Sequence, residues 1–122
     1  MTLLAYVEQN IAALQARVAK EAQNTLANGN PDAIHDLRVS IRRLSQALRA
    51  FEPVIGKRQA RQTRRHLRRW MDEAAEIRNR DIALELLASS GTPLDSPVAK
   101  RLQAGRDQAH KRLALLLARS KP

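Results

Sequence analysis

Residues 34–51 read IHDLRVSIRRLSQALRAF, and this stretch decides the fold that the sequence predicts. Its apolar residues recur every three or four positions, which is the spacing of one face of an α-helix. A second series, polar and largely cationic, runs one position after most of them. Because successive residues lie about 100° apart around a helix, the two series occupy neighbouring faces. The apolar series is Ile34, Leu37, Ile41, Leu44, Leu48 and Phe51, and the polar series is His35, Arg38, Arg42, Ser45 and Arg49.

The composition favours an anionic partner. The chain has 122 residues, which suits one modest domain with its own core, so we expect a single domain over residues 1–122. It carries 22 Lys and Arg against 12 Asp and Glu, a formal charge of +10. Seventeen of these cations are Arg, whose planar guanidinium group suits phosphate or carboxylate. The chain has no Cys, no secretory leader and no long apolar run, so we expect a soluble, cytoplasmic protein without a membrane partner.

The helical spacing recurs along the rest of the chain, with Pro and Gly between the segments. Asn30-Pro31 and Ser96-Pro97 each place an N-capping residue before a Pro suited to the first helical turn. We expect Gly29 to end the first helix in a left-handed turn, residues 53–56 to form a loop, and Gly105 to permit close helix packing. The predicted class is all-α, an antiparallel four-helix bundle. Its helices are expected over residues 3–27, 31–52, 57–88 and 97–119.

The third predicted helix carries a cationic row of its own, displaced by one residue from its apolar face. The row contains Arg61, Arg64, Arg68 and Arg78. From residue 38 to residue 80 there are 13 basic residues and four acidic ones. Like charges in register repel one another, so the arrangement is most plausible where a polyanion neutralises it. The alternative is an ordinary solvated charged face.

Asp81 falls on the apolar face of the same helix. A buried carboxylate is costly unless it is paired. Two compatible interpretations are open. Asp81 forms a buried ion pair that fixes helix register, or it orients an Arg of the cationic row.

The sequence offers little to catalysis or to base recognition. It has no glycine-rich phosphate loop, and its three His residues are spread over three helices without a carboxylate at ligand spacing. We therefore expect no catalytic residue, metal or cofactor. His35 is either a hydrogen-bonded packing residue or a donor beside the cationic row. Tyr6, Phe51 and Trp70 are too few to offer the stacking platforms of a single-strand binder, and no helix-turn-helix spacing is evident.

Two motifs resemble the CHAD family, the conserved histidine α-helical domain. The first is HDLRVSIRRLSQALRAF (35–51), which fills the family pattern His-x-x-Arg-Val-x-x-Arg-Arg-Leu. The second is LRRWMDEAAEIRNRDIALELL (67–87), where Arg78 and Asp81 match and Ile82 replaces Val. The second motif departs from the family at Ala74-Ala75, where Leu-Gly is usual, and at Asn79, where Asp is usual. The residues that match the first motif are His35, Arg38, Val39, Arg42, Arg43 and Leu44.

The resemblance implies a module that binds inorganic polyphosphate through a basic channel and does not hydrolyse it, since no Glu-x-Glu-x-Lys triphosphatase signature occurs. It also implies the association with polyphosphate granules that some members show. The family domain usually has two four-helix halves, so this single half implies a homodimer that completes the channel, or an open groove. Alternatives are a nucleic-acid-binding protein and a structural bundle that pairs with an acidic protein. The candidate binding residues are His35, Arg38, Arg42, Arg43, Arg49, Arg61, Arg64, Arg68 and Arg78, with Asp81 as the orienting residue; helical geometry points Arg43 away from the others.

Overall fold

The computed structural model describes residues 1–119, and its regular structure there is entirely helical. The all-α class predicted from the sequence is therefore confirmed. The described residues form five helices rather than four, because a short helix occupies the predicted loop. The helices are α1 (Leu3–Ala27), α2 (Pro31–Ala50), α3 (Glu52–Ile55), α4 (Lys57–Ser89) and α5 (Pro97–Arg119).

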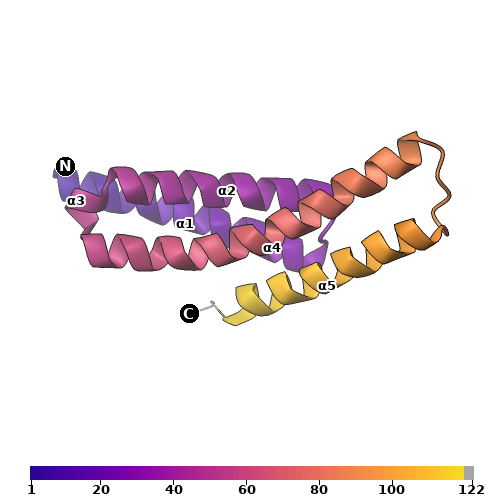
Figure 1. The fold of residues 1–122 in the computed structure, drawn as a ribbon. Coiled ribbons are helices and arrows are strands. Elements are labelled where there is room, and N and C mark those ends of the chain that lie inside the picture. The colour runs from indigo at the N-terminus through magenta and orange to yellow at the C-terminus, as the bar shows by residue number, and fades with distance from the viewer. Residues whose placement is uncertain (120–122) are drawn as a thin grey trace.

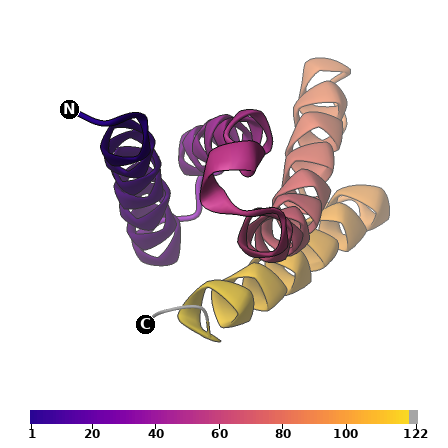
Figure 2. The same cartoon turned by 90° about the vertical axis from the view of Figure 1, so that its left-hand side faces the viewer.

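The long helices form a row rather than an evenly closed square. Consecutive long helices run in opposite directions, and the far end of α4 extends beyond α2 (Figure 1). Helix α2 packs between α1 and α4, and α5 packs mainly along α4. Contact between α5 and α1 is slight, and α4 and α5 lean together away from α1 (Figure 2). The side of the molecule between α1 and α5 is therefore less tightly packed than the α1–α2, α2–α4 and α4–α5 interfaces.

The core follows the apolar series of α2. Five of its six members are buried and Phe51 is half-buried. Leu37 and Ile41 are almost completely inaccessible, as are Val7 of α1 and Ile77 of α4. Burying an aliphatic side chain of this size stabilises the fold by about 1.5–3 kcal/mol. This apolar contact fixes the rotation of α2, and hence the direction in which its cationic series points.

The α2–α4 connection differs from the predicted loop. Helix α2 ends at Ala50, and Pro53 lies in the first turn of α3. Pro is compatible with that turn because its missing N–H is not needed for an intrahelical hydrogen bond there. Gly56, with a φ of 108°, then separates α3 from α4. The prediction that α2 breaks before Pro53 is confirmed, and the prediction of a loop over residues 53–56 is wrong.

The predicted role of Gly29 is also wrong. Within residues 1–119 only Gly56 and Gly91 have positive φ, and α1 ends instead at Asn28 in an extended conformation. Gly29 is needed for space, because a Cβ there would overlap the imidazole of His110 on α5. A Cβ at Gly105 would meet the side chain of Arg80 on α4, and the close helix packing expected at Gly105 stays a prediction.

Both predicted N-caps are present. The Oδ1 atom of Asn30 accepts a hydrogen bond from the N–H of Ala33 at 2.8 Å. The Oγ atom of Ser96 accepts one from the N–H of Ala99 at 3.3 Å. These caps satisfy N–H groups that would otherwise have no partner at the helix start.

Candidate anion-binding site

The cationic rows of α2 and α4 meet at Arg38. Its side chain is half-buried, and its Nε atom is buried without a hydrogen-bond partner. Burial lowers the pKa of Arg38 below its ordinary value, and the guanidinium groups of Arg78 and Arg42 lower that pKa further. Arg78 belongs to α4 and Arg42 to α2. Guanidinium groups from both helices therefore lie close enough to repel one another.

This meeting follows from the local sequence. Arg38 comes one position after the buried Leu37, so it lies at the edge of the α2 apolar face. Because α2 and α4 run antiparallel and pack against each other, the start of α2 lies beside the second half of α4. That alignment places Arg38 and Arg78 next to one another at the border of the two helices. We call the surface along this border the α2–α4 groove; the name refers to the border between the two helices and not to a cavity.

Three of the five acidic residues of α4 are engaged away from the two cationic rows. The Glu73 carboxylate accepts from Arg112 Nε of α5 at 2.6 Å, and Asp81 accepts from Arg106 Nε of α5 at 2.5 Å. Glu76 forms an ion pair within α4, with Arg80. These carboxylates are thus engaged by cations outside the two rows. None of these three carboxylates forms an ion pair with a cation of the two rows.

One cation of the predicted rows has an ion pair among residues 1–119. Arg64 Nη1 lies 3.9 Å from the Glu52 carboxylate, a long and weak contact. The other predicted cations form no ion pair in this part of the chain. Arg38 is half-buried, and His35 is exposed to solvent. The remaining cations of this group are also exposed: Arg42, Arg43, Arg49, Arg61, Arg68 and Arg78.

The structure separates Arg43 from the groove. It follows Arg38 by five positions, which corresponds to about 140° around α2.

Arg61 lies at the other end of the groove, where it also lines an open hollow of about 570 Å³. The same hollow is lined by Lys57, Arg58 and Arg65, none of which was among the candidate residues. Their density in the sequence was a sufficient signal for a basic surface at the start of α4.

The first interpretation of Asp81 describes what the structure shows. The side chains of Arg106 and Asp81 are only 14% and 11% exposed, and Arg106 also donates to the carbonyl oxygen of Gly29. The pair therefore joins α4, α5 and the connection between α1 and α2. Arg106 was not singled out from the sequence, because nothing local distinguishes it from the other cations of its helix.

The remaining histidines do not gather into a site. His110 Nε2 lies 3.4 Å from the carbonyl oxygen of Thr25, which ties α5 to the end of α1. Among the described residues, no three His, Asp or Glu side chains are placed so that they could hold a metal ion. No described helix is both long enough and apolar enough to cross a membrane.

Residues 1–119 define an all-helical protein with an arginine surface between two of its long helices, on which Arg64 has one long ion pair. A model of the CHAD domain matches residues 5–121. The chain therefore belongs to the CHAD domain family. No curated protein and no solved structure matched the chain.

Proposed function

We propose that this chain is a non-enzymatic binding module that holds inorganic polyphosphate along the α2–α4 groove, in the cytoplasm or at polyphosphate granules within it. The observation that carries the proposal is the buried, unpartnered Nε atom of Arg38 beside Arg42 and Arg78. A buried donor without a partner costs about 1–3 kcal/mol. A phosphate oxygen bound to this guanidinium group would relieve the repulsion between the three guanidinium groups, and it would satisfy the Nε–H once the side chain moves to expose it.

The length of the rows favours a polymer over a single phosphate group. Arg61 and Arg78 are 17 positions apart on α4, which corresponds to about 25 Å along the helix. A continuous string of negative groups can contact cations at both ends, whereas a single phosphate cannot. Membership of the CHAD family supports phosphate as the repeating group, given what the resemblance implies.

In this proposal, helices α1, α2, α4 and α5 form one antiparallel four-helix unit and a single domain. A homodimer then completes the channel. Ile82, Leu86, Leu94 and Val98 support a second copy, because these large apolar residues are exposed where the α4–α5 end extends past α2. Light scattering with and without polyphosphate is expected to give twice the mass of one chain. A single-chain mass at every concentration would contradict the dimer and leave an open groove.

Titration with long-chain polyphosphate tests the proposed function directly. If several phosphate contacts are made, the logarithm of the affinity should fall linearly with the logarithm of the salt concentration, as in nucleic-acid binding. Isothermal titration at two salt concentrations measures this slope. RNA at equal phosphate concentration serves as the competitor. Displacement of polyphosphate by RNA would favour the nucleic-acid alternative, and failure of both ligands would favour an acidic protein partner.

Arg38→Met is expected to stabilise the free protein and weaken binding. It removes the buried, unpartnered N–H and the repulsion from Arg42 and Arg78, while the flexible thioether side chain fills much of the same space. We expect thermal unfolding to move up by a few degrees, since about 1 kcal/mol corresponds to several degrees in a chain of this size. Polyphosphate affinity should fall about 10- to 100-fold, the value of one charged hydrogen bond.

The matched control for Arg38→Met is Arg101→Met, on the exposed surface of α5. It removes the same charge and should leave both unfolding temperature and affinity nearly unchanged. Loss of stability in Arg38→Met would mean that the guanidinium group has a partner in the free protein. That result would remove the observation on which the proposal rests.

A further inference from the structure

A separate pocket lies on the side of the molecule where α5 faces α1. Its volume is about 680 Å³, within the range of small-molecule sites in proteins. Helices α1, α4 and α5 form its walls, and α2 contributes Leu44. The pocket exists because α5 packs along α4 and makes only slight contact with α1. It is distinct from the α2–α4 groove, and no candidate residue of that groove lines it.

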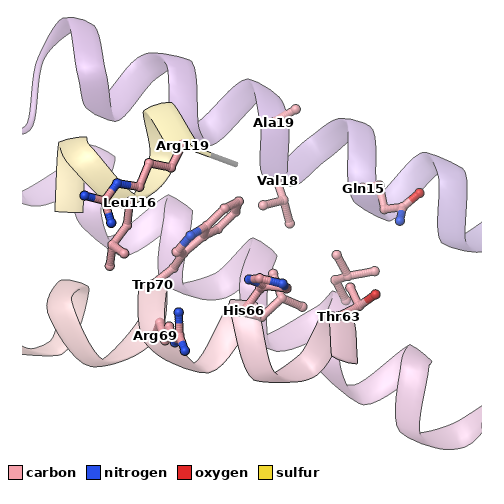
Figure 3. A pocket seen from close by; sticks show the side chains of 11 residues that line it. Gln15, Val18, Ala19, Thr63, His66, Arg69, Trp70, Leu116 and Arg119 are labelled. Atoms are coloured by element: carbon pink, nitrogen blue, oxygen red, sulfur yellow. The ribbon is translucent and has the colours of Figure 1, made fainter. Parts of the chain in front are cut away.

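The walls of this pocket are largely apolar. Val18, Leu44 and Leu67 line it and are otherwise buried in the core. The indole of Trp70 points from α4 toward Val18 of α1, and Leu116 lies beside it (Figure 3). Trp70 is only half-buried, although it is one of the largest apolar side chains in the protein. Covering this surface with an apolar group would release water from it, which favours binding.

The charged groups at the pocket have one sign. Arg69 and Arg119 line it, together with His66, and none of the Asp and Glu residues in 1–119 is among its lining residues. Neither Arg forms an ion pair within residues 1–119. A shallower hollow next to the pocket is also lined by Arg69 and Arg119. Asp72 and Glu73 line this hollow too, but the Glu73 carboxylate accepts a hydrogen bond from Arg112 at 2.6 Å. An apolar pocket with two available guanidinium groups favours a ligand that carries a negative charge at one end.

We infer that this pocket binds an amphipathic carboxylate, a molecule with an aliphatic chain and one terminal carboxylate group. The chain lies against Trp70 and Leu67 between α1, α4 and α5, and the carboxylate pairs with Arg119 beside Leu116. Arg69 adds positive charge on the other side of Trp70 (Figure 3). A guanidinium group binds a carboxylate through two parallel hydrogen bonds, which gives the head group a defined position. Polyphosphate has no apolar part and does not fit these walls. The inference therefore stands independently of the proposed function.

Trp70 is the only tryptophan of the chain, so its fluorescence reports on this pocket alone. The probe is dodecanoate, added below the concentration at which it forms micelles. Dodecyltrimethylammonium, which has the same chain and the opposite charge, is the comparison ligand. We expect a saturable blue shift of the Trp70 emission with dodecanoate, and affinity for the cationic ligand at least about tenfold weaker, because the guanidinium groups repel it.

The variant Arg69→Glu/Arg119→Glu reverses the charge of two lining residues and leaves the apolar residues of the pocket unchanged. We expect its affinity for dodecanoate to fall at least about tenfold, a typical loss for a charge-assisted hydrogen bond, and its affinity for the cationic ligand to rise. Lys100→Glu/Arg101→Glu makes the same change in net charge at the other end of α5 and should bind dodecanoate as the wild type does. Neither Arg69→Glu/Arg119→Glu nor Lys100→Glu/Arg101→Glu changes a candidate residue of the α2–α4 groove.

Three outcomes would overturn the inference. The first is an absence of any saturable change in Trp70 emission. The second is an equal response to both amphiphiles, which would indicate adsorption without a site for the carboxylate. The third is an emission shift that depends on protein concentration alone and parallels dimer formation in light scattering, since a second copy would then cover the pocket.

Discussion

The double substitution Arg38→Glu/Arg42→Glu is expected to weaken polyphosphate binding at least about 100-fold. It removes two charge-assisted contacts, each worth about 1.5–3 kcal/mol, and places negative charge in the centre of the groove. Arg78 would then face carboxylates in place of the guanidinium groups that now lower the pKa of Arg38. The loss of two phosphate contacts should also reduce the salt slope by about two. Titration with long-chain polyphosphate at two salt concentrations measures both quantities.

The control is Lys100→Glu/Arg101→Glu, which changes the net charge by the same amount on the exposed surface of α5. Helix α5 does not pack against α2, so this variant should keep the wild-type salt slope. Its affinity should fall only slightly, through the general loss of positive charge. Equal losses in the two variants would mean that net charge alone attracts the ligand. Unchanged binding by the first variant would remove the α2–α4 groove as the site.

The second large effect is expected for Asp81→Ala. The substitution leaves the guanidinium group of Arg106 mostly buried and without its carboxylate partner. Removing one member of a buried ion pair typically costs about 3–5 kcal/mol. In a chain of this size the unfolding temperature should fall by about 10 °C or more. Thermal unfolding followed by circular dichroism measures the change.

Two further variants separate the causes of this loss. Glu76→Ala removes the exposed pair with Arg80 within α4 and should cost no more than about 0.5 kcal/mol. Asp81→Ala/Arg106→Leu removes both buried charges and should recover most of the stability lost in the single variant. If the double variant were as unstable as Asp81→Ala, the ion pair would not be the source of the effect.

The single variant Asp81→Ala also distinguishes the two interpretations of Asp81. Polyphosphate binding is measured at a temperature where Asp81→Ala remains folded. A structural ion pair predicts wild-type affinity under these conditions, because Arg106 lies on α5 and outside the groove. A fall in affinity of the folded variant would show that Asp81 also orients the cations of the α2–α4 groove.

The sequence by itself determined the all-α class, the long helices and the alignment of cations beside an apolar face. These features depend on local periodicity and on local helix-start signals such as Asn30-Pro31, which act within one or two helical turns. The same reasoning found Arg38, Arg42 and Arg78, because a one-residue offset from a buried face places them at its border. It failed at Pro53, which suited both a loop and the first turn of a short helix.

Only the tertiary structure decided which charges remain free and where the packing stays open. The partner of Asp81 lies 25 positions away on another helix, and the carbonyl group that Arg106 also binds lies 77 positions away. Three α4 carboxylates, Glu73, Glu76 and Asp81, pair with Arg residues outside the two cationic rows, and the slight contact between α5 and α1 leaves the Trp70 pocket open. Both results depend on how whole helices pack, and helix packing is not encoded in any single stretch of the chain.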